Sequence, residues 1–182
     1  MELALKSSLL RAWRTTDTES LLRYANNENV SRNMRDAFPY PYTRVDAESW
    51  ITTAMANSER IWAIEVGGEA VGGMGLHPME DVYRKTAEIG YWLAEPFWGQ
   101  GITTEALIAA THHTFEHFDL VRLEAGIYSW NPASGRVLEK AGYALEAINR
   151  KAIFKNGQLL DRHLYVAFAD AETSDNMSDT QP

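Results

Sequence analysis

The chain has 182 residues, 45% of them hydrophobic, a formal net charge of −8 and no cysteine. This length supports one ordinary domain with one sizeable core, and the lack of cysteine excludes disulfides, thiolate metal sites and a cysteine nucleophile. Four acidic residues fall among the last thirteen, so the rest of the chain is only mildly acidic, which argues against a nucleic-acid-binding surface and suits a cationic substrate such as an amine.

The distribution of apolar residues bears on localisation. No apolar run approaches the length of a membrane span, and residues 1–14 lack the continuous apolar stretch of a secretory signal. We therefore expect a cytoplasmic protein that does not bind membranes. Residues 170–182 are polar, acidic and almost free of large apolar side chains, which predicts a disordered tail after a domain over residues 1–169.

Apolar periodicity and turn residues predict the secondary structure. In chain order the pattern indicates a strand over Leu9–Trp13, a helix from Thr16-Asp17 to about Asn26, a helix over Asp46–Asn57, strands over Ile61–Val66, Glu69–Leu76 and Thr86–Leu93, a helix over Glu105–Phe118, a strand over Arg122–Tyr128, a helix over Pro132–Lys140, and strands over Lys151–Lys155 and Leu159–Phe168.

Local signals support several of these boundaries. Asp17 and Asp46 are suitable N-caps for the first two helices. The segment Phe38–Tyr42 alternates aromatic residues with prolines, which predicts a shaped loop. Asn156-Gly157 between alternating runs is the strongest short hairpin signal. The order predicts a single α/β domain of the α+β type, with a mixed, mostly antiparallel sheet of about six to seven strands and about four flanking helices.

Two glycines one residue apart, Gly99 and Gly101, lie between the predicted strand Thr86–Leu93 and the helix that follows. A glycine turn at a helix start leaves several main-chain N–H groups free, which makes the segment a candidate phosphate site. Equally, the glycines could serve only to let the chain turn sharply. The sequence contains neither GxxxxGK[ST] nor a third glycine that completes GxGxxG, so the common nucleotide motifs do not apply.

Two segments in order carry a family resemblance. Residues 89–93 (IGYWL) lead into residues 98–106 (WGQGITTEA), and residues 131–143 read NPASGRVLEKAGY. Together with the order of elements they resemble the GNAT superfamily of acyl-CoA N-acyltransferases, over about residues 9–168. Within it the chain is most similar to the RimJ/RimL-like branch, which acetylates ribosomal-protein N-termini.

The resemblance implies acetyl-CoA as the cofactor and no metal. The family's turn reads [R/Q]xxGx[G/A], and its amides cradle the coenzyme pyrophosphate. Here that frame falls on Trp98, Gly101 and Thr103, so two of its three positions depart from the pattern. The pantetheine arm would lie along the strand before the turn. The implied coenzyme contacts are Tyr91, Trp92, Leu93, Trp98, Gly99, Gln100, Gly101, Ile102, Thr103, Thr104 and Asn131.

Three residues are candidates for catalysis. The family's usual proton-donating tyrosine aligns with Leu138, and the resemblance implies Ser134 as its replacement, with Asn131 binding the pantetheine or a water. Asn131 and Ser134 also suit a helix cap with proline at the first helical position. Glu88 is the candidate base or proton relay. A solvent-facing Glu88 that pairs with Arg84 or Lys85 is an equally good interpretation.

The resemblance implies that the loop Phe38–Tyr42 and the second helix wall the acceptor site. The candidate acceptor contacts are Tyr40, Tyr42, Trp50 and His77, although packing beneath a loop explains such aromatic residues equally well. His113 and His117 are one helical turn apart, but no third ligand accompanies them.

The leading hypothesis is acetyl transfer from acetyl-CoA to a primary amine, specifically a protein N-terminal α-amine, by direct attack. The alternatives are a small-molecule amine, such as a polyamine, an amino acid or an antibiotic, and a noncatalytic acyl-CoA-binding module. We expect a monomer or a homodimer.

Overall fold

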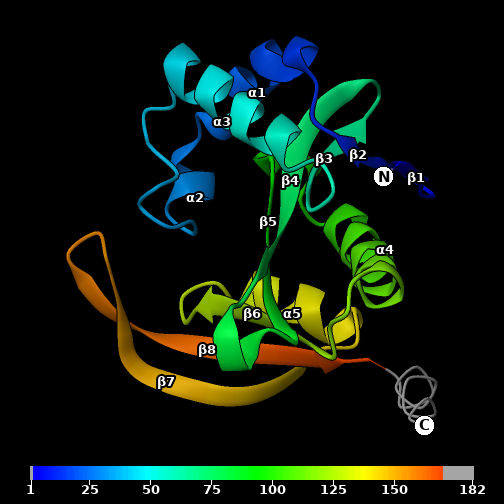
Figure 1. Ribbon diagram of the computed structural model, residues 1–182. Helices are drawn as coiled ribbons and strands as arrows, with labels where there is room; N and C mark the ends of the chain where they lie inside the picture. The colour runs from blue at the N-terminus through cyan, green and yellow to red at the C-terminus, as the bar shows by residue number, and fades with distance from the viewer. Residues whose placement is uncertain (1, 170–182) are drawn as a thin grey trace, which may run out of the picture.

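One mixed sheet runs through the computed structural model of the chain, which describes residues 2–169 (Figure 1). Its strands are β1 Glu2–Ala4, β2 Leu9–Ala12, β3 Ile61–Val66, β4 Glu69–Pro78, β5 Thr86–Leu93, β6 Arg122–Tyr128, β7 Ala144–Lys155 and β8 Gln158–Phe168. The spatial order is β1-β2-β3-β4-β5-β6-β8-β7. All neighbours are antiparallel except β5 and β6, which are parallel. The predicted tail lies outside the described residues.

Helices cover both faces of the sheet (Figure 1). Among residues 2–169 they are α1 Thr18–Ala25, α2 Glu28–Ser31, α3 Arg44–Ala56, α4 Ile102–His117 and α5 Pro132–Lys140. α1, α2 and α3 lie on one side, and α4 and α5 lie on the other. None of these helices combines the length and the apolar character needed to cross a bilayer.

The predicted fold class is confirmed, while the numbers of strands and helices are higher than expected. The three-residue strand β1 and the four-residue helix α2 were not predicted, because segments this short carry no measurable periodicity. β7 begins at Ala144 rather than Lys151, and its early residues are mostly exposed, so no alternating pattern marks them. α4 begins at Ile102, directly after Gly101, which is its N-cap.

One predicted helix cap is wrong, and a second is right in position but makes no capping hydrogen bond. Thr43, not Asp46, is the N-cap of α3: its hydroxyl accepts from the Asp46 N–H at 3.3 Å, and the Asp46 carboxylate accepts from the Thr43 N–H at 2.8 Å. This reciprocal pair is a capping box, in which the acidic residue is the third helical residue rather than the cap. Asp17 is the N-cap residue of α1, as predicted, but its side chain makes no capping hydrogen bond to that helix. Its carboxylate is used elsewhere.

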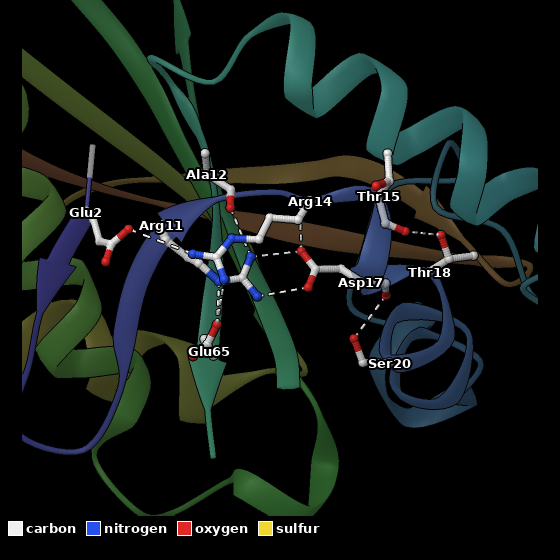
Figure 2. Close-up of polar contacts among 9 residues, drawn as sticks. All are labelled: Glu2, Arg11, Ala12, Arg14, Thr15, Asp17, Thr18, Ser20 and Glu65. Atoms are coloured by element: carbon white, nitrogen blue, oxygen red, sulfur yellow. Dashed lines mark hydrogen bonds and ion pairs between the residues drawn. The ribbon is translucent and has the colours of Figure 1, made fainter. Parts of the chain in front are cut away.

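Asp17 is the partner of a buried arginine (Figure 2). Arg11 on β2 is 2% exposed, and its two terminal nitrogens each donate to one Asp17 oxygen at 2.8 Å. Its Nε also donates to Glu65 on β3. The Arg14 N–H donates to Asp17 at 2.8 Å, which completes the network. The fork geometry of guanidinium and carboxylate joins the start of α1 to two strands of the sheet.

The parallel strands β5 and β6 pair only at their beginnings. The register joins Thr86 to Arg122, Ala87 to Leu123 and Glu88 to Glu124, and no further pair follows. From Ile89 onward the β6-facing edge of β5 therefore has no strand partner, while its other edge stays paired with β4 as far as Leu93. An unpaired strand edge inside a sheet is a place where an extended ligand can add its own hydrogen bonds.

Candidate active site

Strand β5 presents different side chains to the two faces of the sheet at this opening. Tyr91 points to the side of α5, where its hydroxyl lies 2.8 Å from the Ser134 hydroxyl. Trp92 points to the other side, where its ring meets Phe38 edge-on with centroids 5.6 Å apart. Because side chains alternate along a strand, Glu88 and Gly90 share the face of Trp92. The opening thus has Ser134 on one side and Glu88 on the other.

The first turn of α5 positions Ser134. Asn131 is the N-cap, and its side-chain oxygen accepts from the Ser134 N–H at 3.3 Å, with Pro132 as the first helical residue. The predicted cap is thereby confirmed. Tyr91 is largely buried, and burial raises the pKa of its phenol, so the group stays protonated and remains a hydrogen-bond donor at neutral pH. Asn131, Ser134 and Tyr91 are brought together.

The glycine turn is open above its main chain. Gly99 and Gly101 have φ of 74° and 81°, and a Cβ at either position would meet nothing within 4 Å. Gly101 is the N-cap of α4 and supplies no side-chain oxygen to the first N–H groups of the helix. These amides, at Ile102, Thr103 and Thr104, have the geometry of an anion site.

The other two side chains of the turn hold its shape. Trp98 donates from Nε1 to the Leu93 carbonyl at 2.7 Å, and Gln100 donates to the Pro96 carbonyl at 3.0 Å. Trp92 and Leu93 are buried in the core. The side chains of Trp92, Leu93, Trp98 and Gln100 are therefore occupied within the protein, and only the main chain of this segment is left to contact a coenzyme.

Glu88 has an unforeseen partner. Arg35, in the loop after α2, places one guanidinium nitrogen 2.5 and 2.7 Å from the two Glu88 oxygens. The two cations that the sequence offered as partners of Glu88 bind other groups. Lys85 pairs with Asp119, and Arg84 donates to the Asp81 carbonyl. Glu88 is 24% exposed and Arg35 is 72% exposed, so this ion pair lies at the rim of the opening.

The sheet is bare between Glu88 and Trp92. Gly90 pairs with Gly75 on β4, and a Cβ at Gly90 would meet nothing within 4 Å. His77 on β4 is directly opposite Glu88 in the register. A Cβ at Gly75 would lie 3.2 Å from the His77 ring, so this ring covers β4 there. The main chain of β5 at Gly90 stays uncovered next to a carboxylate, which leaves room for a small group to approach β5.

The predicted acceptor residues lie on different elements. His77 is opposite Glu88 in the strand register, and Tyr42 is 7% exposed and packs against Phe38 at a centroid distance of 5.2 Å. Tyr40 is 52% exposed, and Trp50 is partly buried against the core on α3. His113 and His117 stack on one another at 4.1 Å, and no group of three or more metal-binding side chains occurs among residues 2–169.

Sequence reasoning missed Arg35 and the contact between Tyr91 and Ser134. Arg35 lies in a loop 53 residues before Glu88, and Tyr91 is 43 residues before Ser134. No local pattern joins residues so far apart. Placing Gly90 and Tyr91 on opposite faces of the predicted strand could have identified Tyr91 as the side chain facing the helix after Asn131.

Comparison with known proteins identifies the fold and the family. Residues 8–144 match the family described as the acetyltransferase (GNAT) domain. Ribosomal-protein-serine acetyltransferase of Escherichia coli is 36% identical over 104 residues, which are 57% of this chain and 58% of that protein. The match thus spans less than two thirds of this curated relative.

Solved structures extend the similarity over nearly the whole chain. A RimL ribosomal L7/L12 alpha-N-protein acetyltransferase in complex with coenzyme A superposes with a TM-score of 0.83 at 24% identity, covering 94% of this chain and 99% of that one. Mycobacterium smegmatis RimJ in complex with a CoA-disulfide gives 0.80 at 24% identity, covering 96% and 88%. These two related structures hold coenzyme A and a CoA-disulfide.

Proposed function

Because the chain belongs to the GNAT acetyltransferase family, we propose that it transfers an acetyl group from acetyl-CoA to the α-amine at a protein N-terminus. The observation that carries the proposal is the opening between β5 and β6, where pairing stops after Glu88. It connects the glycine turn and Ser134 on one side of the sheet with Glu88 on the other. Two reactants can thus meet at β5 from opposite faces.

The residues present fit coenzyme A. The amides of Ile102, Thr103 and Thr104 would bind the pyrophosphate at the start of α4, since the turn above them is open and lacks a capping side chain. The unpaired edge of β5 at residues 90–93 would hydrogen-bond the pantetheine amides in the manner of an added strand. Bound acetyl-CoA supplies an acetyl group activated as a thioester.

Gly101→Val tests the glycine turn. A β-branched residue is strained at a φ of 81°, so the turn must shift and carry its amides away from the pyrophosphate. We expect the Kd for coenzyme A to rise roughly tenfold to a hundredfold, which corresponds to about 1.4–2.8 kcal/mol, in calorimetric titrations.

Gly68→Val is the matched control for this change. Gly68 has a φ of 87° in the turn between β3 and β4 and is equally open. Both variants should lose a similar amount of stability, while only Gly101→Val should lose coenzyme affinity. Equal affinity in the two variants would contradict the assignment of the turn.

The acceptor amine must lose a proton before it attacks. Deprotonation at pH 7 costs about 1.4 kcal/mol for an α-amine of pKa near 8 and about 4.6 kcal/mol for a lysine of pKa near 10.4. An α-amine therefore needs little help. Glu88 would attract its ammonium form and pass its proton to solvent, and Arg35 must leave Glu88 for this to happen. The bare main chain at Gly90 gives the amine access.

On the other face, Ser134 would donate a proton to the departing thiol. The Tyr91 phenol can donate to the Ser134 oxygen at 2.8 Å, which leaves the serine hydrogen free to point into the opening. Asn131 would hold the start of α5 and present its remaining amide hydrogens to the pantetheine.

A panel of acceptors tests the proposed function. The purified protein, labelled acetyl-CoA, cell extract, N-terminal peptides of ribosomal proteins and small amines would be analysed together by mass spectrometry. We expect acetylation of peptide α-amines. Acetylation confined to polyamines, amino acids or aminated antibiotics would show that the acceptor is a small molecule and not a protein N-terminus. Tight coenzyme binding without any acetylated amine would favour a noncatalytic module.

A further inference from the structure

The ring of His77 lies beside the bare stretch of main chain at the opening. His77 is on β4, and a Cβ at Gly75 would lie 3.2 Å from its Nε2 atom, so the ring leans back along the strand over Gly75. Gly75 is paired with Gly90 of β5. Residues paired across two strands share one face of the sheet, with Cβ positions about 5 Å apart. A group that approaches Gly90 on this face is therefore a direct neighbour of the His77 ring.

Glycine at both paired positions leaves the space for this approach. A Cβ at Gly75 would be closer to the imidazole than an ordinary van der Waals contact, so a side chain there would push the ring away from the sheet. A Cβ at Gly90 would meet nothing within 4 Å, so a side chain there would instead occupy the space beside the ring. The opening thus has room for a small group between the main chain of β5 and His77.

The imidazole of His77 has no partner, whereas the carboxylate of Glu88 has one. Within residues 2–169 the His77 side chain makes no hydrogen bond or ion pair, and the residue is exposed. The two Glu88 oxygens lie 2.5 and 2.7 Å from one Arg35 nitrogen, which stabilises the charged carboxylate and makes it a weaker proton acceptor. His77 is therefore an available basic group beside Gly90.

The surroundings of His77 favour the neutral imidazole. Glu88 faces the ring from β5, Arg35 from the loop after α2, and Arg60 from the position directly before β3. Loss of hydration against the sheet lowers the pKa of His77 most, and the two arginines lower it further, against the opposing effect of Glu88. A neutral imidazole at pH 7 has a free electron pair, which a base requires.

We propose that His77 is the base that takes the proton from the acceptor ammonium, an inference that rests on the proposed function. The proton would pass to a ring nitrogen directly or through one water. This route leaves the pair of Arg35 and Glu88 intact, whereas deprotonation through Glu88 requires the pair to break.

The protons and bonds of the transfer balance along this route. The ammonium gives one proton to His77, which passes it to solvent, and the freed electron pair attacks the acetyl carbonyl. The C–N bond forms, and the C–S bond breaks as the departing sulfur takes the Ser134 proton. The nitrogen then loses its second proton, which restores the Ser134 hydroxyl by way of water. The products are the N-acetylated acceptor, coenzyme A and one proton in solvent.

The pH dependence of a single turnover tests His77. The full chain is mixed with acetyl-CoA and a saturating peptide that has a free α-amine, and the rate of acetylation is followed from pH 6 to pH 9. In His77→Gln only acceptors that are already neutral can react, and about one α-amine in ten is neutral at pH 7 when its pKa is near 8. The variant should therefore be about tenfold slower than the unaltered protein at pH 7 and equally fast at pH 9.

His112→Gln is the matched control for His77→Gln. His112 is exposed on α4, which packs on the other face of the sheet, so its replacement should leave the rate unchanged at every pH. The Kd for coenzyme A, measured by calorimetric titration, should be the same in both variants and in the unaltered protein, because neither histidine lies at the glycine turn.

Two results for His77→Gln would overturn the assignment. One is a rate within about twofold of the unaltered protein at pH 7. The other is a loss of equal size at every pH, because a base becomes dispensable once the amine is neutral. Glu88→Gln is measured in parallel, and a loss at pH 7 that disappears by pH 9 in this variant alone would make Glu88 the base. Acetyl transfer stands in all three cases.

Failure of the proposed function gives a different result. If the unaltered protein acetylates no peptide α-amine at any pH from 6 to 9, the proposed acceptor fails and the role of His77 fails with it.

Discussion

We expect Ser134→Ala to lower kcat by roughly a hundredfold to ten-thousandfold, the range typical of removing a general acid. The serine hydroxyl lies 2.8 Å from the Tyr91 hydroxyl at the mouth of the opening, so alanine removes the group that would protonate the leaving thiol. The Asn131 cap binds the Ser134 main-chain N–H, which alanine retains, so α5 should keep its first turn. Steady-state kinetics combined with calorimetric titration of coenzyme A separates the rate effect from binding.

The coenzyme Kd should stay within about twofold in this variant, since main-chain amides bind the pyrophosphate. Ser129→Ala is the matched control, because Ser129 is exposed in the turn before α5 and its side chain makes no hydrogen bond within the described part of the chain. The kcat of Tyr91→Phe should lie between those of Ser134→Ala and Ser129→Ala. Phenylalanine can no longer orient the Ser134 hydroxyl, but the hydroxyl itself remains. An unchanged kcat in Ser134→Ala would remove Ser134 from the mechanism.

Features set by neighbouring residues were the ones that the sequence predicted. Asn156 and Gly157 have φ of 50° and 76°, as a two-residue hairpin turn requires, and Asn131 with Pro132 begins α5. Each depends on conformational preferences within four residues. The strand, turn and helix from Thr86 to His117 were readable for the same reason, because β alternation, glycine freedom and helical periodicity are all local.

Features set by distant residues were not predictable. Asp17 is the N-cap of α1, but its carboxylate binds a buried arginine on β2 and the Arg14 N–H instead of the N–H groups of that helix. Glu88 has the cations Arg84 and Lys85 close to it in sequence, yet it pairs with Arg35 in the loop after α2.

Arg11→Ala should cause the largest loss of stability, about 3–5 kcal/mol, because it leaves the carboxylates of Asp17 and Glu65 without their shared cation. Asp17 is 5% exposed and Glu65 is 17% exposed, so water cannot fully replace the guanidinium. Urea unfolding monitored by tryptophan fluorescence measures the change through the transition midpoint at a constant m-value.

Arg23→Ala is the matched control for Arg11→Ala. Arg23 also pairs with a glutamate, Glu69, at 2.7 Å, but the two side chains are 61% and 42% exposed, so its loss should destabilise the protein much less than the loss of Arg11. Acidification separates unpaired charge from lost packing. Protonation neutralises the carboxylates that Arg11→Ala leaves behind, and the folded state gains more from this than the unfolded state, where they are already solvated.

The deficit of Arg11→Ala relative to the unaltered protein should therefore shrink as pH falls from about 7 to about 5. A deficit that stays constant over this range would mean that Arg11 acts through the packing of its aliphatic stem rather than through its charge. A deficit no larger than that of Arg23→Ala would mean that the start of α1 is held to β2 and β3 by apolar contacts alone.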